Sequence, residues 1–228
     1  RAAAGPAMTG LPLYAQLINL FAAILLLLAF AMLSQRRVWS LINLFAAQGL
    51  ALAISTAIVA YGTHQTHLYW SAGLTLILKV VLLPLLLRRL ITKLNVKWDV
   101  EALFNVSTPM IVGIVLVILA FNLVQPVAQL AGSVTKSTLG IALAAVLLAF
   151  LMMITRSKAV PQVVGFLAME NGLVLAATGA TYGMTMVIEF GIALDVMVGV
   201  LILGVFFFQI RERFDSIDTR HLEKLKDT

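Results

Sequence analysis

Residues 161–182 read PQVVGFLAMENGLVLAATGATY, an apolar run that carries an acid, Glu170, and an amide, Asn171, near its middle. The hydrocarbon core of a bilayer is ~30 Å thick and needs about 20 apolar residues to be crossed by a helix. An ionised side chain at the centre of such a helix costs about 2.5–3.5 kcal/mol on insertion scales. The stretch therefore predicts a membrane helix whose acid requires a partner group or water.

The rest of the chain has the same apolar character. Of its 228 residues, 61% are hydrophobic and 11% are charged, whereas soluble domains have roughly 45–50% apolar and about 25% charged residues. We therefore expect an all-α integral membrane protein, multi-pass in the cell (inner) membrane, with seven transmembrane helices. The expected spans are residues 12–33, 40–60, 68–88, 107–125, 137–155, 161–182 and 187–209.

Basic residues gather after the odd-numbered spans. Because translocation disfavours basic loops, these ends are expected in the cytoplasm. The N-terminus is therefore predicted outside and the C-terminus in the cytoplasm, so that the net charge of +6 reflects topology rather than binding to nucleic acid. The basic residues after the odd spans are Arg36, Arg37, Arg88, Arg89, Lys93, Lys97, Arg156, Lys158, Arg211 and Arg213, whereas the loops after the even spans hold Lys136.

Several kinds of chemistry are excluded by residues that the sequence lacks. The chain has no cysteine, which excludes disulfides, thiol catalysis and iron–sulfur ligation through thiolates. His64 and His67 lie in a short loop without an acidic neighbour, so we interpret them as loop polars rather than metal ligands. The sequence also has no Gly-rich phosphate loop, serine elbow or paired-carboxylate hydrolase pattern. We therefore expect no metal, no cofactor and no catalytic residue.

A faint internal echo bears on the grouping of the spans. AQGLALA at 47–53 resembles ENGLVLA at 170–176, and each stretch follows a basic loop. The echo indicates either two three-helix units in the same orientation, as parallel repeats, or a chance match in apolar sequence. The expected divisions are an N-terminal extension at 1–11, a first three-helix unit at 12–98, a cytoplasmic loop and linking fourth helix at 99–126, a second three-helix unit at 127–210 and a charged cytoplasmic tail at 211–228.

Four charged residues fall at membrane positions: Lys79, Glu170, Glu189 and Asp195. At a helical rise of ~1.5 Å per residue, Lys79 and Glu170 each lie about 14 Å from the cytoplasmic edge, so they can pair if the third and sixth spans adjoin. Asp195 is expected about 21 Å from that edge, which staggers the two carboxylates along the membrane normal. Glu189 begins the last span at the outer interface, and we interpret it as a boundary residue.

Helix faces suggest how the acids are covered. Gly191, Asp195 and Gly199 recur at four-residue spacing, which places Asp195 on a stripe of small residues that packs closely against another helix. Glu170 lies opposite a similar stripe on its own span. A lipid-facing acid is not credible, so we expect its face to meet the seventh helix or another subunit. The stripe on the sixth span consists of Gly165, Ala168, Gly172, Ala176 and Gly179.

Pro84 follows Lys79 by five residues within the third span. Because proline has no amide hydrogen, the carbonyl of Val80 loses its partner and the helix is expected to kink. The freed carbonyl either attracts water beside the buried ammonium, or the kink serves packing alone.

Each buried charge has a structural and a functional interpretation. Glu170, assisted by Asn171, and Asp195 are either neutral hydrogen-bonded groups that fix helix packing or members of a proton relay. Lys79 is either a salt-bridge partner or a further member. Groups held away from water are those that can load and release protons near neutral pH. This favours a relay of Glu170, Asp195 and Lys79, with Asn171 and Glu189 as supporting polar groups.

The motifs around these residues resemble those of a known family. RSKAVPQVVGFLAMENGLVL at 156–175, EFGIALDVMVGVLIL at 189–203 and SAGLTLILKVVLLPLLL at 71–87 are similar to segments of the membrane subunit called hydrogenase-4 component E. The resemblance extends over nearly the whole chain.

The last three spans also resemble the K subunit of respiratory complex I and the C subunit of multi-subunit sodium/proton antiporters. Glu170 matches the first of two membrane glutamates of the K subunit. Asp195 matches the second, with an aspartate in its place. Spans one to four have no counterpart there, and Ala47 or Gln48 stands where an acid of the first unit would be.

The resemblance implies a non-catalytic membrane subunit of a complex I-like hydrogenase or a related redox-driven complex, with carboxylates that contribute to proton or sodium translocation. The implied partners are other membrane subunits, including antiporter-like ones, the lipid bilayer and, indirectly, peripheral hydrogenase-type subunits. Two alternatives stay open. One is an independent secondary transporter, and the other is a purely structural scaffold for larger ion-pumping subunits.

Overall fold

The computed structural model describes residues 13–94, 106–128, 133–181, 190–202 and 204, and the regular elements among them are helices. Six of these helices are long and apolar enough to cross a membrane, so the chain is a multi-pass membrane protein. The helices are α1 (Leu13–Ser34), α2 (Val38–Thr63), α3 (Thr66–Thr75), η1 (Leu76–Leu82), α4 (Leu83–Leu94), α5 (Ser107–Ala128), α6 (Ser133–Thr155), α7 (Ala159–Thr181) and a shorter helix at Phe190–Ile202.

The third predicted span is one continuous helix with a change of winding inside it. α3, η1 and α4 follow each other without a break, and Thr66–Thr92 counts as one membrane crossing. The first six predicted spans are confirmed as helices with ends within a few residues of those expected. The seventh is described over Phe190–Ile202. Its full length, the orientation of the termini and the grouping into two three-helix units stay predictions.

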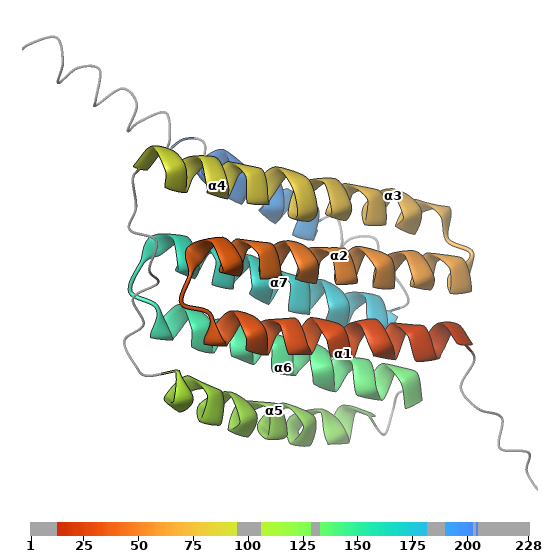
Figure 1. Ribbon diagram of the computed structural model, residues 1–228. Helices are drawn as coiled ribbons and strands as arrows, with labels where there is room; N and C mark the ends of the chain where they lie inside the picture. Colours follow the sequence, from red (N-terminus) through yellow and green to blue (C-terminus); the bar gives the residue numbers. More distant parts are fainter. Residues whose placement is uncertain (1–12, 95–105, 129–132, 182–189, 203, 205–228) are drawn as a thin grey trace, which may run out of the picture.

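The helices form two stacked layers. α1, α2 and the α3–α4 helix make one layer, and α6, α7 and the Phe190–Ile202 helix lie behind it (Figure 1). Contacts of α1 with α6, and of α2 with α7, join the layers, while α5 packs at the edge against α6 and α1. The layers bring α7 and the last helix behind η1, the segment that carries Lys79.

Small residues set the distance between α6 and α7. A Cβ atom added to Gly172 would lie 2.8 Å from Val146 Cγ2, and one added to Gly165 would lie 2.7 Å from Met153 Cγ. Such separations are too short for a side chain, so glycine is needed for this close packing. The predicted small-residue stripe of α7 is therefore confirmed as its face toward α6, which directs Glu170 to the other side of the helix.

A buried arginine joins two turns at one end of the bundle. Arg156, between α6 and α7, is 3% exposed and donates to the carbonyl oxygens of Leu33 (2.7 Å) and Gln35 (2.8 Å). Burial, and then the nearby Arg36, lower the pKa of Arg156 from its ordinary value. The guanidinium thus donates hydrogen bonds to carbonyl groups at the end of α1 that have no partner within the helix. A cation is also favoured at this end by the helix dipole.

Candidate functional site

The centre of the third span is a π-helix that carries Lys79. At the end of η1 the amide of Leu83 donates to the carbonyl of Leu78, five residues earlier. Short π segments inside α-helices are rare and are frequently found at functional sites. The segment ends directly before Pro84, the second residue of α4, which has no amide hydrogen with which to continue the α-helical pattern. The distortion thus begins before the proline; the predicted kink at Pro84 stays a prediction.

Lys79 is buried against a glycine. The residue is 1% exposed, and a Cβ atom on Gly49 of α2 would lie 2.8 Å from Lys79 Cβ. Only a residue without a side chain allows α2 to approach η1 at this height. The lysine side chain therefore passes between helices instead of reaching the lipid.

The ammonium of Lys79 contacts two acids from two other helices. It donates to Glu170 Oε2 on α7, and its Nζ lies 3.5 Å from Asp195 Oδ2 on the Phe190–Ile202 helix. It also donates to Asn171 Oδ1 at 2.7 Å. Glu170 is 2% exposed, Asn171 0% and Asp195 1%. We call Lys79, Glu170, Asn171 and Asp195 the charge cluster.

Gln48 extends the cluster toward α2. The Asn171 Nδ2 group donates to Gln48 Oε1 at 3.0 Å, and Gln48 is fully buried. Because Asn171 accepts from Lys79 through its oxygen and donates to Gln48 through its nitrogen, Gln48 holds the amide with the oxygen toward the ammonium. Sequence reasoning did not include Gln48 in the site. The usable signal was the internal echo, which places Gln48 and Asn171 at equivalent positions.

Charge and hydrogen bonding in the cluster are both unbalanced. With all groups ionised, two carboxylates face one ammonium, which leaves one excess negative charge. Glu170 Oε1 and both oxygens of Asp195 are buried without a hydrogen-bond partner. A buried charge or acceptor without a partner is costly. One proton added to either carboxylate would remove the excess charge, so the arrangement is chemically suited to hold one exchangeable proton.

The two acids meet at one ammonium, and the stagger expected between their positions along the membrane normal stays a prediction. The carboxyl groups of Glu170 and Asp195 approach the same Nζ atom, so the charges meet at one place in the bundle. The expectation counted Asp195 from an inner helix end at residue 209, which lies outside the described residues. The ion pair between Lys79 and Glu170, expected from matching depths, is present.

The predicted covering of the acids is confirmed. A Cβ atom on Gly191 would lie 2.7 Å from Glu170 Oε1, and one on Gly199 would lie 3.8 Å from side chains of α4. The last helix therefore packs with its small residues into the space between α7 and α4, and covers the acid-bearing face of α7. Glu189 lies outside the described residues.

The remaining titratable residues of the described chain do not join the cluster. His64 lies in the turn after α2, with a φ of 55°, and His67 lies in the first turn of α3. Both are exposed. Within the described ranges, no group of three His, Cys, Asp or Glu side chains is placed to hold a metal ion.

Comparison with known proteins gives relatives that extend over almost the whole chain. An uncharacterised protein of Mycobacterium tuberculosis is 32% identical over 209 residues, which cover 91% of this chain and 95% of the relative. Proteins described as hydrogenase-4 component E, from Escherichia coli K12 and Shigella flexneri, are each 26% identical over 220 residues, covering 96% of this chain and all of theirs. No family model and no solved structure matches the chain.

The comparisons agree with the family resemblance given by the sequence motifs. Full-length coverage at this identity includes the helices that supply Lys79, Glu170 and Asp195. The chain is thus a distant relative of hydrogenase-4 component E, at 26% identity over 96% of its length.

Proposed function

We propose that this protein is a non-catalytic membrane subunit of a complex I-like hydrogenase, or of a related redox-driven complex in the cell membrane, and that its charge cluster takes part in proton or sodium translocation. The family relationship supports membership of a multi-subunit assembly, because the relatives are described as a component of hydrogenase-4. The partners would be other membrane subunits, including antiporter-like ones.

The single observation that carries the proposal is the placement of one buried ammonium between two buried carboxylates. Lys79 can neutralise only one acid at a time, so a proton on Glu170 would favour contact of Lys79 with Asp195, and a proton on Asp195 would favour contact with Glu170. Moving a proton between the acids is therefore coupled to movement of a positive charge. A relay that responds to charge in a neighbouring subunit needs this kind of coupling.

The test is Glu170→Gln in the assembled complex in native membranes. The amide keeps the size of the side chain and can still accept a hydrogen bond from Lys79, but it cannot take up or release a proton near neutral pH. We expect hydrogen-driven proton uptake into inverted vesicles to fall at least tenfold, while the amount of assembled complex is unchanged. Glu101→Gln, the same change in the predicted cytoplasmic loop, is the matched control and should transport normally. Normal proton uptake by an assembled Glu170→Gln complex would overturn the proposed relay.

The structural-scaffold interpretation has one observation in its favour: Lys79 donates hydrogen bonds to Glu170 and Asn171 and forms an ion pair with Asp195, which joins η1, α7 and the last helix. The double variant Lys79→Met with Glu170→Gln separates it from the relay. If the cluster only fixes packing, transport by the double variant should fall only as far as the amount of assembled complex falls. If the cluster relays protons, the double variant should assemble without transport.

A further inference from the structure

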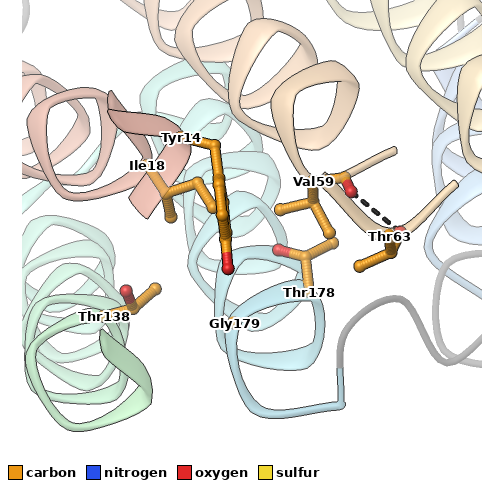
Figure 2. Close-up of a pocket in the computed structure, with 7 residues that line it drawn as sticks. All are labelled: Tyr14, Ile18, Val59, Thr63, Thr138, Thr178 and Gly179. Atoms are coloured by element: carbon orange, nitrogen blue, oxygen red, sulfur yellow. Dashed lines mark hydrogen bonds between the residues drawn. The ribbon is translucent and has the colours of Figure 1, made fainter. Parts of the chain in front are cut away.

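A small cavity lies at the end of the bundle that is distant from Arg36, Arg88 and Arg156. It has a volume of about 30 Å³ and sits between α1, α2, α6 and α7. Figure 2 shows side chains from these four helices around a common space. The lining side chains include Tyr14, Ile18, Val59, Thr63, Thr138 and Thr178.

Two of the hydroxyl groups that line the cavity can accept hydrogen bonds from an occupant but cannot donate to it. Thr63 Oγ1 donates to the carbonyl of Val59 at 2.8 Å, and Thr178 Oγ1 donates to the carbonyl of Val174 at 2.9 Å. A hydroxyl group has one hydrogen and two lone pairs. Because each hydrogen is already used within its own helix, the oxygens present lone pairs to any occupant. These two groups therefore favour an occupant that donates hydrogen bonds.

The size and charge of the cavity favour water over a cation. None of its lining residues is an acid, so a cation there would lack a compensating charge. A water molecule needs roughly 10–15 Å³ of such space and two to four polar partners. The cavity volume of about 30 Å³ and its hydroxyl groups satisfy both requirements.

The polar groups continue from the cavity toward the charge cluster along α2 and α7. Thr178 is seven residues beyond Asn171, which is about 10 Å along the helix. On α2, Ser55 is likewise seven residues beyond Gln48 and so lies at about the height of Thr178. Ser55 is 1% exposed, and its Oγ has no hydrogen-bond partner. Gln48 Nε2, at the cluster, is also buried without a partner. Unpaired polar atoms thus recur along one helix interface.

An apolar layer interrupts this row. Leu52 of α2 and Val174 of α7 are buried in one hydrophobic cluster and lie in sequence between the cavity residues and the residues of the charge cluster. Water at Ser55 would therefore have to cross this apolar layer, over about 10 Å along the helices, to reach Gln48.

We propose that the cavity is a water site and, with Ser55, forms a hydrated access route to the charge cluster from the end of the bundle that holds Tyr14. The route supplies or removes the proton of the cluster, which rests on the proposed function. Ser55, Thr63 and Thr178 are positioning residues for this water.

The absence of cysteine from these 228 residues allows a direct test. Single variants Ser55→Cys and Thr178→Cys are prepared in the full complex, in vesicles of known orientation, and exposed to Ag⁺, an ion of about the size of water that binds thiolates. After unfolding, thiols that Ag⁺ has not reached are counted with N-ethylmaleimide. Thr155→Cys and Leu148→Cys are matched controls on α6, because both residues are buried. Thr155 is the last residue of that helix, and Leu148 lies ten residues beyond Thr138 of the cavity.

We expect Ag⁺ added on the Tyr14 side to block Thr178→Cys and Ser55→Cys at least tenfold faster than either control. Equal rates at Ser55→Cys and Leu148→Cys, or blocking only from the other side, would overturn the route. Where a cysteine variant fails to assemble, Ser55→Ala and Thr178→Val replace it, with slower hydrogen–deuterium exchange of the cluster carboxyl groups as the expected infrared signal. Unchanged exchange in both would also overturn the route.

The two proposals fail independently. Ag⁺ reports water without requiring any ion transport, so a dry cavity in a transporting complex overturns the route alone. A hydrated cavity together with normal transport by Glu170→Gln overturns the relay and leaves the water site in place.

Discussion

Two similar stretches, AQGLALA in α2 and ENGLVLA in α7, pack against each other and serve different purposes. Their second residues, Gln48 and Asn171, are hydrogen-bonded to each other. Their third residues are glycines that face different neighbours: Gly49 packs on Lys79, and Gly172 packs on Val146 of α6.

The difference lies in how each helix is turned. In α7 the glycine faces α6, so Glu170 is directed at η1 and its lysine. In α2 the glycine itself faces η1, and the first position holds Ala47 in place of an acid. The same short pattern therefore supplies the acid from one side of Lys79 and the space for its side chain from the other.

The largest effect should come from removing the group that the two stretches share. In Lys79→Met, Glu170 and Asp195 lose their cation. Breaking a buried ion pair by removing one partner costs about 3–5 kcal/mol, and we expect a loss of unfolding free energy in that range in detergent. The double variant with Glu170→Gln should recover part of it. An unchanged midpoint of thermal unfolding for Lys79→Met would show that the cation does not hold α7 to η1.

A smaller effect is expected from Gly49→Ala. The added methyl group would lie 2.8 Å from Lys79 Cβ, and such overpacking costs about 1–3 kcal/mol. Gly73→Ala is the matched control in the same region, because a Cβ atom there has nothing within 4 Å. Denaturation of the purified variants should show a lower free energy of unfolding for Gly49→Ala and no change for Gly73→Ala. Equal behaviour of the two variants would contradict the close contact between α2 and η1.

The smallest effect is expected where the two stretches are alike. Leu50 and Leu173 occupy equivalent positions and are 41% and 46% exposed. Alanine at either should change the unfolding free energy by less than about 0.5 kcal/mol, as is usual for surface positions. Thermal unfolding of both variants tests this. A large loss of unfolding free energy in only one of the two variants would contradict the similar surroundings of Leu50 and Leu173.

Much of the fold could be predicted from the lengths of the apolar runs, because a bilayer imposes one element type and one length. The pairing of Lys79 with Glu170 followed from their equal depth, which depends only on helical rise. The contact of Asp195 with the same ammonium could not be predicted, since it depends on how far the lysine extends and how the last helix is turned. Gln48 was missed because its partner comes from a helix 123 residues away.

The π-helical winding of η1 was also missed. Pro84 predicted an interruption, but the direction in which the helix adjusts depends on Gly49 and the neighbours that surround Lys79. The sequence of one helix can indicate where such a distortion occurs. It does not show whether the helix bends or winds more widely, because that depends on the neighbouring helices.

The distance in sequence between Lys79 and its acid has a consequence for biosynthesis. The two residues are 91 positions apart, and at a synthesis rate of about 5–20 residues per second the lysine emerges about 5–18 s before Glu170 does. During that interval the third helix must rest in the translocon or at the lipid boundary with an uncompensated ammonium. Stable insertion of the third helix is thus completed only when the later helices have been synthesised. The nascent chain therefore depends more on the insertion machinery than the finished protein does.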